Sequence, residues 1–223
     1  MKSKLVERSS QVISVVFHPI FMVVYALLYL LMTNPYLFST QEPKELSIVI
    51  MYIVIISVVF PGIAIGMLYN LGMIQSISMP ERKQRIVPLI ITATFYCWLY
   101  INLLNNNSIP AVFQSFVLGT NIGLFVGFFI TLFNKVSLHS IAISGLTTGL
   151  IIAHYIEGYE YFELQIGQMN IGINSILPLA ILVVFVGMVA SARLYLNRHT
   201  IEQILGGTFI GILSQLIAMR FLL

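Results

Sequence analysis

The chain has 223 residues, of which 58% are hydrophobic and only 9% are charged, with a mean hydropathy of +0.95 and a net charge of +3. Soluble domains carry roughly one quarter charged residues, so this chain has too few charges to cover a water-exposed surface. The composition excludes a soluble globular protein and indicates an integral membrane protein.

The first apolar run follows a basic start formed by Lys2, Lys4 and Arg8. A secretory signal peptide has a similar layout, but its apolar part is shorter and ends in a small-x-small cleavage site. The run here extends from about 12 to 33 and lacks such a site. We therefore predict that it is the first transmembrane helix.

Seven apolar segments have about the 20 residues that a membrane-spanning helix needs. They cover about 11–33, 47–69, 87–105, 110–133, 138–156, 174–196 and 200–222. Turn residues occupy several breaks, as in Asn34-Pro35 and Asn105 to Pro110, and the segments 70–86 and 157–173 are the most hydrophilic loops. We predict an all-α fold, a polytopic helical bundle with six to seven transmembrane helices, forming a single membrane domain over 1–223.

Glycines recur at helical spacing within the predicted spans, which is typical of helices that pack closely through small faces. These glycines are Gly119, Gly123, Gly127, Gly145, Gly149, Gly207 and Gly211. The single cysteine, Cys97, lies in an apolar run, so the chain has neither an intrachain disulfide nor a cysteine metal cluster.

If all seven segments span, the basic residues divide unequally between the two ends of the bundle. One end holds Lys2, Lys4, Arg8, Arg82, Lys83, Arg85, Lys135, Arg193 and Arg198. The other end holds only Lys44 and Arg220, together with five of the eight acidic residues. The positive-inside rule would make the basic end cytoplasmic, and an anion-binding face is the functional interpretation of the same charges.

Three polar clusters share this basic end, at 81–88, 135–139 and 193–203. Together they offer several cations, two histidines and hydroxyl groups at the level of the lipid headgroups. Cations stabilise the phosphate oxygens during phosphoryl transfer. One histidine can attack phosphorus while the other protonates the leaving oxygen. The clusters therefore favour phosphoryl transfer from a lipid.

At these residues the chain resembles the type 2 phosphatidic acid phosphatase superfamily, whose third motif is Ser-Arg, five residues, His, three residues, Asp. Arg193 and His199 match that spacing, Ala192 and Gln203 replace the serine and the aspartate, and Gly206-Gly207 follows as in such proteins.

The other two motifs of the family are present in looser form. Ser137 and His139 match two positions of its Pro-Ser-Gly-His motif. The first motif, Lys, six residues, Arg-Pro, is absent as a string, and a basic cluster stands at a comparable distance upstream: Arg82, Lys83, Arg85 and Pro88.

The resemblance covers about 82–211 and makes 1–70, with the first two spans, accessory. It implies a metal-independent lipid phosphatase without a cofactor, acting through a phosphohistidine on His199, with His139 as the acid. It further implies that the phosphate is held by Arg193, with Lys83 and either Arg85 or Arg82, and that the Ser137 hydroxyl assists.

Gln203 stands where the family has an aspartate that orients the nucleophile. Residues at i and i+4 of a helix can meet, so the Gln203 oxygen can accept the His199 ring N–H. It lacks the negative charge that would stabilise an imidazolium, which predicts a slower or differently tuned enzyme. Glu202, at i+3, is the alternative orienting group.

The remaining polar residues have plainer interpretations. We interpret His18, before Pro19, as a histidine of helix entry or packing, with a supporting role at the basic end as the alternative. His154 lies beside tyrosines in an aromatic belt at the other end. Arg198 is interfacial, Lys135 has no fixed role in the family, and Asn121 is expected to form interhelical hydrogen bonds.

Two functions remain open: a lipid phosphatase acting on an isoprenyl diphosphate, a phosphatidylglycerol phosphate or a related lipid, and a non-catalytic or transport protein that binds a lipid phosphate in the same pocket. The expected partners are a lipid phosphate and membrane lipids, without nucleic acid, and the oligomeric state is not predicted.

We expect a multi-pass protein of a cell membrane, of bacterial cytoplasmic type. Bacterial relatives would place the site on the outer face, whereas the charge count places it inside, so both sides stay open.

Overall fold

The computed structural model describes residues 4–39, 42–79, 81–104, 106–167 and 169–222; Lys2 and Asn105 lie outside this range. Seven helical segments within it are long and apolar enough to cross a membrane: Lys4–Thr33, Pro43–Asn70, Lys83–Leu104, Ala111–Phe133, Leu138–Glu157, Ile176–Tyr195 and Ile201–Phe221. The prediction of an all-α, multi-pass membrane bundle is confirmed.

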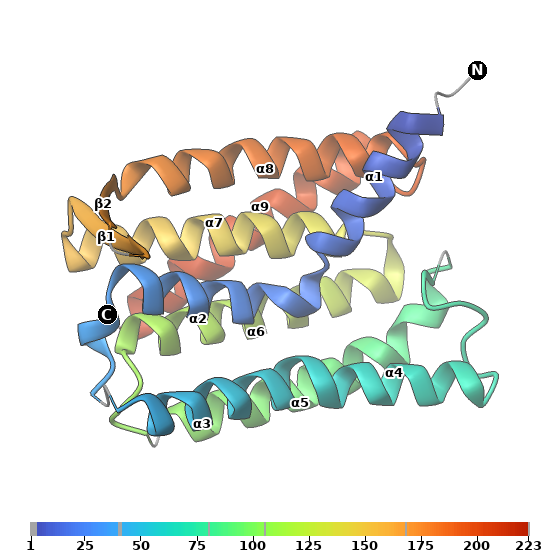
Figure 1. Cartoon of the computed structure of the whole chain (residues 1–223). Coiled ribbons are helices and arrows are strands. Elements are labelled where there is room, and N and C mark those ends of the chain that lie inside the picture. Colours follow the sequence, from blue (N-terminus) through green and yellow to red (C-terminus); the bar gives the residue numbers. More distant parts are fainter. Residues whose placement is uncertain (1–3, 40–41, 80, 105, 168, 223) are drawn as a thin grey trace.

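The principal helices follow one another in up-and-down order (Figure 1). They are α1 (Lys4–Val16), α2 (Met22–Thr33), α3 (Pro43–Val54), α4 (Phe60–Asn70), α5 (Ile86–Leu104), α6 (Ala111–Phe133), α7 (Leu138–Glu157), α8 (Ile176–Tyr195) and α9 (Ile201–Leu222). The N-terminal end of α1 and the α4–α5, α6–α7 and α8–α9 connections lie at one end of the bundle, which we call the basic end. The C-terminus lies at the opposite end.

The first span is not the single continuous helix that the sequence predicts. It breaks at Pro19, where α1 gives way to the short helix η1 (Pro19–Phe21) and then to α2, which runs in a different direction (Figure 1). Proline has no N–H to donate within a helix and disfavours helical geometry in the residue before it. His18 accordingly has extended backbone angles, φ −69° and ψ 136°.

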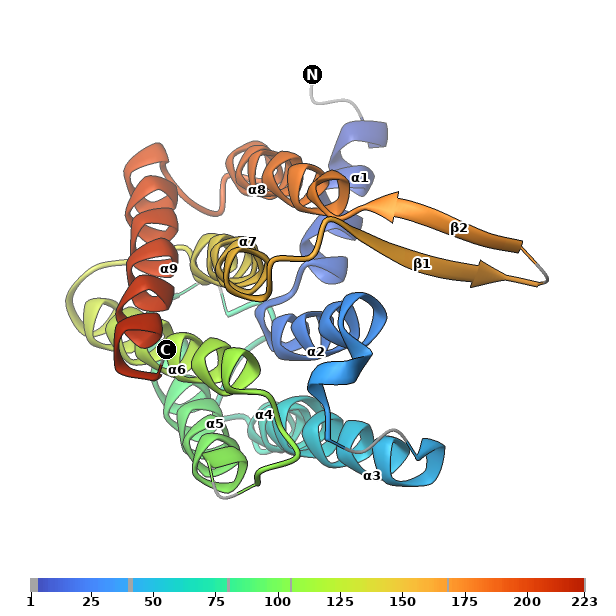
Figure 2. The same cartoon turned by 90° about the vertical axis from the view of Figure 1, so that its left-hand side faces the viewer.

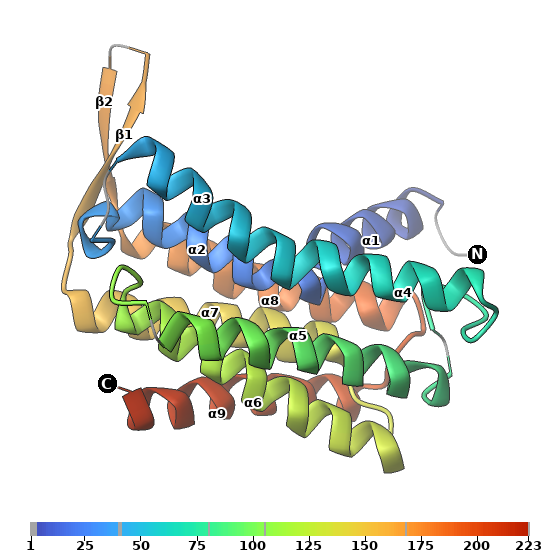
Figure 3. The same cartoon turned by 90° about the horizontal axis from the view of Figure 1, so that it is seen from below.

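The second span accommodates its proline without breaking. A single π-helical segment, η3 (Ile55–Val59), joins α3 to α4, and the two run on as one long helix (Figure 3). The ring of Pro61 would meet the carbonyl one turn earlier in a regular α-helix, and a π-helical turn relieves such a clash. The span begins at Pro43, four residues before the predicted start.

A β-hairpin replaces most of the loop predicted over 157–173. Its strands β1 (Tyr161–Ile166) and β2 (Met169–Asn174) pair antiparallel, with Tyr161 opposite Asn174 and Ile166 opposite Met169. Gly167 begins the turn with φ +64°, a conformation that favours glycine. The hairpin projects away from the helices at the end opposite the basic end (Figures 1 and 2).

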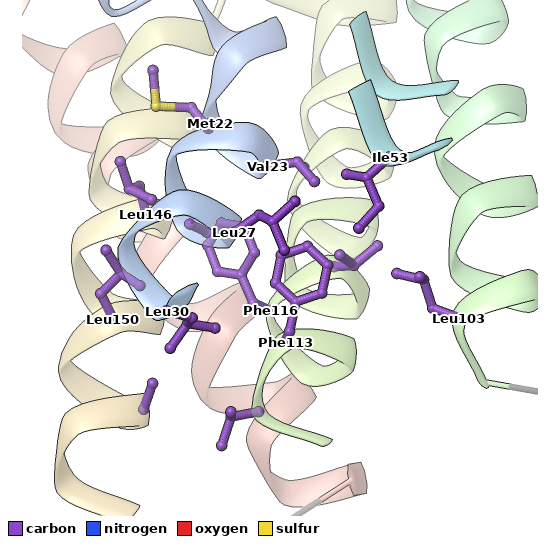
Figure 4. Close-up of a cluster of buried hydrophobic side chains, with 14 of the residues drawn as sticks. Met22, Val23, Leu27, Leu30, Ile53, Leu103, Phe113, Phe116, Leu146 and Leu150 are labelled. Carbon is purple, nitrogen blue, oxygen red and sulfur yellow. The ribbon is translucent and has the colours of Figure 1, made fainter. Parts of the chain in front are cut away.

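The glycine faces pack as predicted. A Cβ on Gly211 of α9 would overlap the Ser144 side chain and the Ile141 carbonyl of α7, and one on Gly207 would lie 2.7 Å from the Ser137 carbonyl. This close approach is what small residues permit between membrane helices. The larger apolar side chains, among them Leu27, Phe113, Phe116 and Leu146, fill the space between α2, α6 and α7 (Figure 4).

The expected interhelical hydrogen bond of Asn121 is also present. Its side-chain amide on α6 donates to the Tyr96 carbonyl of α5 at 3.1 Å and to the Val117 carbonyl at 2.9 Å. In an apolar environment an unpaired amide is costly, and the bond to Tyr96 joins α6 to α5 while the bond to Val117 lies within α6. The helices α6, α7 and α9 also pack against one another.

Candidate functional site

A cavity of about 180 Å³ begins at the basic end and extends between the helices toward the middle of the bundle. Three histidines and two arginines are among the side chains that line it: His18, His139, His199, Arg85 and Arg193. Its inner part is lined by small and apolar residues and ends near Gln215 of α9. No carboxylate occurs among the described lining residues. The positively charged part of the lining therefore lies toward the basic end, and most of the remaining lining is small or apolar.

His199 stands at the start of α9, held by the side chain one turn later. Its Nδ1 lies 3.0 Å from Gln203 Oε1, which also accepts the backbone N–H of Thr200 at 3.4 Å. Because an amide oxygen can only accept, Nδ1 carries the proton and Nε2 keeps its lone pair. Only 7% of the residue is exposed.

Burial is the main reason that the pKa of His199 falls to about 3, and the charges of Arg193, Arg85 and Lys135 lower it further. The hydrogen bond that His199 donates to Gln203 acts in the opposite direction and raises that pKa. At neutral pH the ring is consequently an uncharged imidazole. A neutral ring with a free Nε2 is a competent nucleophile.

The geometry settles which neighbour contacts the ring. Gln203 forms the contact expected for the orienting residue. Glu202 is exposed and instead accepts the Thr200 hydroxyl at 2.9 Å, at the N-terminus of α9. A carboxylate in this first turn stabilises the helix end. The alternative in which Glu202 orients His199 is not what the structure shows.

Arg85 and Arg193 supply the positive charge of the cavity. Arg85 is only 8% exposed, and its Nε donates to the Met79 carbonyl at 2.8 Å. Arg193 donates weakly from Nη1 to Ser14 Oγ at 3.4 Å, and its buried Nε has no hydrogen-bond partner among the described residues. Arg85 is buried and Arg193 is partly buried, and cations removed from water without a carboxylate partner are costly, so the pair is suited to an anionic ligand.

Lys135 adds to this excess of positive charge from the α6–α7 connection. Partial burial lowers the pKa of its ammonium group, and the charges of Arg85, Arg193 and Arg198 lower it further. The like charges thus repel one another across the basic end in the absence of an anion. A bound phosphate would relieve that repulsion.

His139 also lines the cavity, near the start of α7. Its Nε2 lies 3.0 Å from the backbone carbonyl of Ser14 on α1. A carbonyl oxygen only accepts, so Nε2 carries a proton and Nδ1 is the nitrogen that remains for other partners. The ring of His18 packs edge-on against it, with centroids 5.5 Å apart.

Three residues predicted to bind the substrate do not line the cavity. Arg82 donates to the Thr131 and Leu132 carbonyls at the C-terminus of α6, where a cation complements the helix dipole. Lys83 is exposed at the start of the short helix η4 (Lys83–Arg85). Ser137 caps α7, and its hydroxyl oxygen accepts the Ser140 N–H at 3.3 Å and hydroxyl at 2.8 Å. Of the upstream cluster, Arg85 and Pro88 line the cavity, whereas Arg82 and Lys83 do not.

The first span contributes directly to the site, although the resemblance implies that 1–70 is accessory. Ser14 contacts both His139 and Arg193, and His18 lines the cavity. The sequence interpretation of His18 as a packing residue missed this position. The available signals were the His-Pro pair inside a span and the loop parity that places it at the basic end.

Comparison of the chain with protein families, curated proteins and solved structures finds no match. Among the described residues, no group of three or more His, Cys, Asp or Glu side chains could hold a metal ion. What the site can do chemically follows from its own groups: a neutral imidazole with a free nitrogen, two further histidines and two guanidinium groups, one buried and one partly buried, around one cavity.

Proposed function

We propose that this chain is a metal-independent membrane lipid phosphatase that hydrolyses a lipid phosphate or diphosphate through a phosphohistidine on His199. The observation that carries the proposal is the carboxylate-free cavity in which Arg85 and Arg193 surround a neutral His199 with an unprotonated Nε2. Isoprenyl diphosphates, phosphatidylglycerol phosphate and related lipids are the substrate class.

In the first step the His199 Nε2 attacks phosphorus and the bond to the leaving oxygen breaks. Arg85 and Arg193 bind the non-bridging oxygens and stabilise the charge that moves onto them. When the anionic substrate is bound, its negative charge favours a second proton on His139, taken up from solvent at Nδ1. His139 gives that proton to the leaving oxygen, while its Nε2–H stays on the Ser14 carbonyl. Gln203 keeps the His199 Nδ1 proton in place as the ring becomes a phosphorylated imidazolium.

In the second step water attacks the phosphorus and the bond to Nε2 breaks. His139, now neutral, accepts the proton from water, and inorganic phosphate leaves. His199 returns to its neutral state with the proton on Nδ1. No redox change or metal is needed to balance either step.

A lipid substrate suits the shape of the cavity better than a soluble phosphate ester does. The charged groups lie near the basic-end termini of their helices, and apolar side chains such as Leu89, Leu124 and Ile141 make up much of the remaining lining. A hydrocarbon chain entering there removes apolar surface from water while the phosphate stays beside the arginines. This arrangement supports the choice of a lipid phosphate.

The second candidate is a protein that binds or transports a lipid phosphate without hydrolysing it. It is favoured by the neutral Gln203, which gives no charge to an imidazolium, and by the engagement of His139 with the Ser14 carbonyl. Both features suit a binding site whose histidines act as fixed hydrogen-bond partners. Phosphate release separates the two functions.

The test uses the full-length protein in detergent, with phosphate release measured from phosphatidic acid, phosphatidylglycerol phosphate and an isoprenyl diphosphate in excess EDTA. Release by the wild type and its loss in His199→Ala are expected. Arg85→Gln should raise KM by about tenfold or more, as expected for a lost charged contact. Arg82→Gln, which removes a neighbouring cation outside the cavity, is the matched control with an unchanged KM.

Two outcomes would contradict hydrolysis at this site. Undiminished release by His199→Ala would remove the nucleophile from the mechanism, and release only with a divalent cation would remove the metal-independent chemistry. Binding of the lipid phosphates without release would favour the second candidate.

A further inference from the structure

His18 occupies a fixed position because the chain around it cannot continue as a helix. Pro19 forces the extended backbone of His18, and the His18 side chain then turns to accept the Ile20 N–H on Nδ1 at 3.3 Å. This is a side-chain cap on the short helix η1. The bond specifies the tautomer: with Nδ1 accepting, the neutral ring carries its proton on Nε2.

Two tyrosine hydroxyls form hydrogen bonds with backbone carbonyls on either side of the break at Pro19. Tyr25 donates its hydroxyl to the Val16 carbonyl at 2.8 Å, and Tyr96 of α5 donates to the Ile20 carbonyl at 3.3 Å. These carbonyls would otherwise be unpaired where the helix is interrupted inside a membrane. The break is therefore a stable part of the fold, and it presents His18 at the same place in every molecule.

His18 lines the cavity, and its Nε2 is the ring nitrogen that is not used to cap η1. His18 lines it together with Arg193 and His199, and the charge of Arg193 acts on its ring. The residue is exposed, and its Nε2 has no hydrogen bond to any residue in the described part of the chain. A neutral N–H donor near the Arg193 guanidinium adds a directed hydrogen bond for an anion without adding to the repulsion between charges.

We propose that His18 is a substrate-binding residue of the phosphate site, whose Nε2–H donates a hydrogen bond to a phosphoryl oxygen of the bound lipid. The inference rests on the proposed function for the identity of the anion. It gives His18 a role distinct from that of His139, whose Nε2–H is already committed to the Ser14 carbonyl. The first span thereby supplies a direct contact to the substrate.

The experiment measures equilibrium binding of dihexanoyl phosphatidic acid, and separately of inorganic phosphate, to the full-length protein in detergent. His18→Phe keeps a ring of similar size against Phe21 and His139 but has no donor, whereas His18→Gln loses the ring and keeps an N–H donor. His154→Phe is the matched control, because that histidine packs against Tyr159 at the opposite end.

The Kd of His18→Phe should rise by about tenfold or more for both probes, since a hydrogen bond to a charged group is lost. His18→Gln should stay within about threefold of the wild type, as expected for a retained donor, and His154→Phe should be unchanged. Tighter wild-type binding of the lipid than of inorganic phosphate would identify the headgroup as the natural source of the anion. The reverse order of affinity would identify free phosphate.

Unchanged binding by His18→Phe would overturn the proposal, because it would show that the donor contributes nothing. Equal weakening in His18→Phe and His18→Gln, with a lower thermal midpoint in both, would also overturn it in favour of a packing role. Wild-type binding without phosphate release would refute the phosphatase and leave the His18 contact standing. Absence of wild-type binding to either probe would refute both.

Discussion

Gln203 provides the sharpest test of the proposed chemistry, because it is the side chain that orients His199. Removing it in Gln203→Ala deletes the 3.0 Å bond to Nδ1, and the ring then also populates the tautomer whose Nε2 is protonated and cannot attack. A neutral hydrogen bond of this kind contributes about 1 kcal/mol, which corresponds to about a fivefold loss in kcat.

Gln203→Asp should instead preserve or raise kcat. A carboxylate makes a charge-assisted bond that is roughly twice as strong as a neutral one, and it stabilises the imidazolium formed when Nε2 is phosphorylated. The gain of about 1 kcal/mol would raise the rate of the first step by about fivefold. Phosphate release from phosphatidic acid under saturating conditions measures both variants.

The pH dependence supplies a second readout of the same contact. In the wild type the pKa of His199 is about 3, so protonation of this ring should not reduce kcat/KM until the pH approaches that value. A carboxylate at 203 favours the charged ring and raises the pKa of His199. The acid limb of kcat/KM should therefore move to higher pH in Gln203→Asp. In Gln203→Ala the limb should not move to higher pH, because that variant loses the hydrogen bond that raises the pKa of His199.

Glu202→Gln is the matched control, because Glu202 is the neighbouring acid and contacts only the exposed Thr200 hydroxyl among the contacts described. Its turnover should equal that of the wild type. Equal turnover in the wild type and Gln203→Ala would refute the orienting role. A loss in Glu202→Gln as large as that in Gln203→Ala would show that the effect comes from the end of α9 rather than from the ring.

Two further predictions concern the fold. Gly211→Ala should destabilise the protein by about 1–3 kcal/mol, because its Cβ would overlap the α7 backbone. Gly187→Ala, which has open space around the added Cβ, should leave the stability unchanged. Thermal unfolding in detergent compares the two variants, and equal midpoints would contradict the close packing of α9 against α7. With Cys97 replaced by alanine, single cysteines at Glu81 and Asn107 should react oppositely with a membrane-impermeant reagent in intact cells, because they flank spans at opposite ends of the bundle. The reactive position identifies the outer face, and labelling of both would refute the seven-span topology.

Much of the fold was accessible from local sequence properties. Apolar runs of about the thickness of a bilayer identify membrane spans whatever surrounds them, because lipid requires each backbone segment to satisfy its own hydrogen bonds. Counting spans then assigned Arg85, His139, Arg193 and His199 to one end. The i, i+4 spacing on a helix was sufficient to predict the contact between His199 and Gln203.

Other features were outside the reach of such reasoning. The hairpin at 161–174 depends on pairing between two short strands, and its sequence carries no clear alternation of apolar and polar residues. The broken first span depends on how Tyr25 and Tyr96 satisfy the carbonyls that Pro19 leaves free. A hydropathy profile reveals neither the hairpin nor the break, because it averages over many neighbouring residues.

By itself, the sequence determined the membrane class, the spans and the shared end of the polar clusters, because these follow from hydropathy, chain length and helical period. Only the tertiary structure decided which side chains of those clusters meet. Arg85 faces the cavity while Arg82, three residues earlier, binds the end of α6, and His18 enters the site through the break at Pro19. Side-chain direction depends on the rotation and packing of each helix against its neighbours, which are long-range properties of the folded chain.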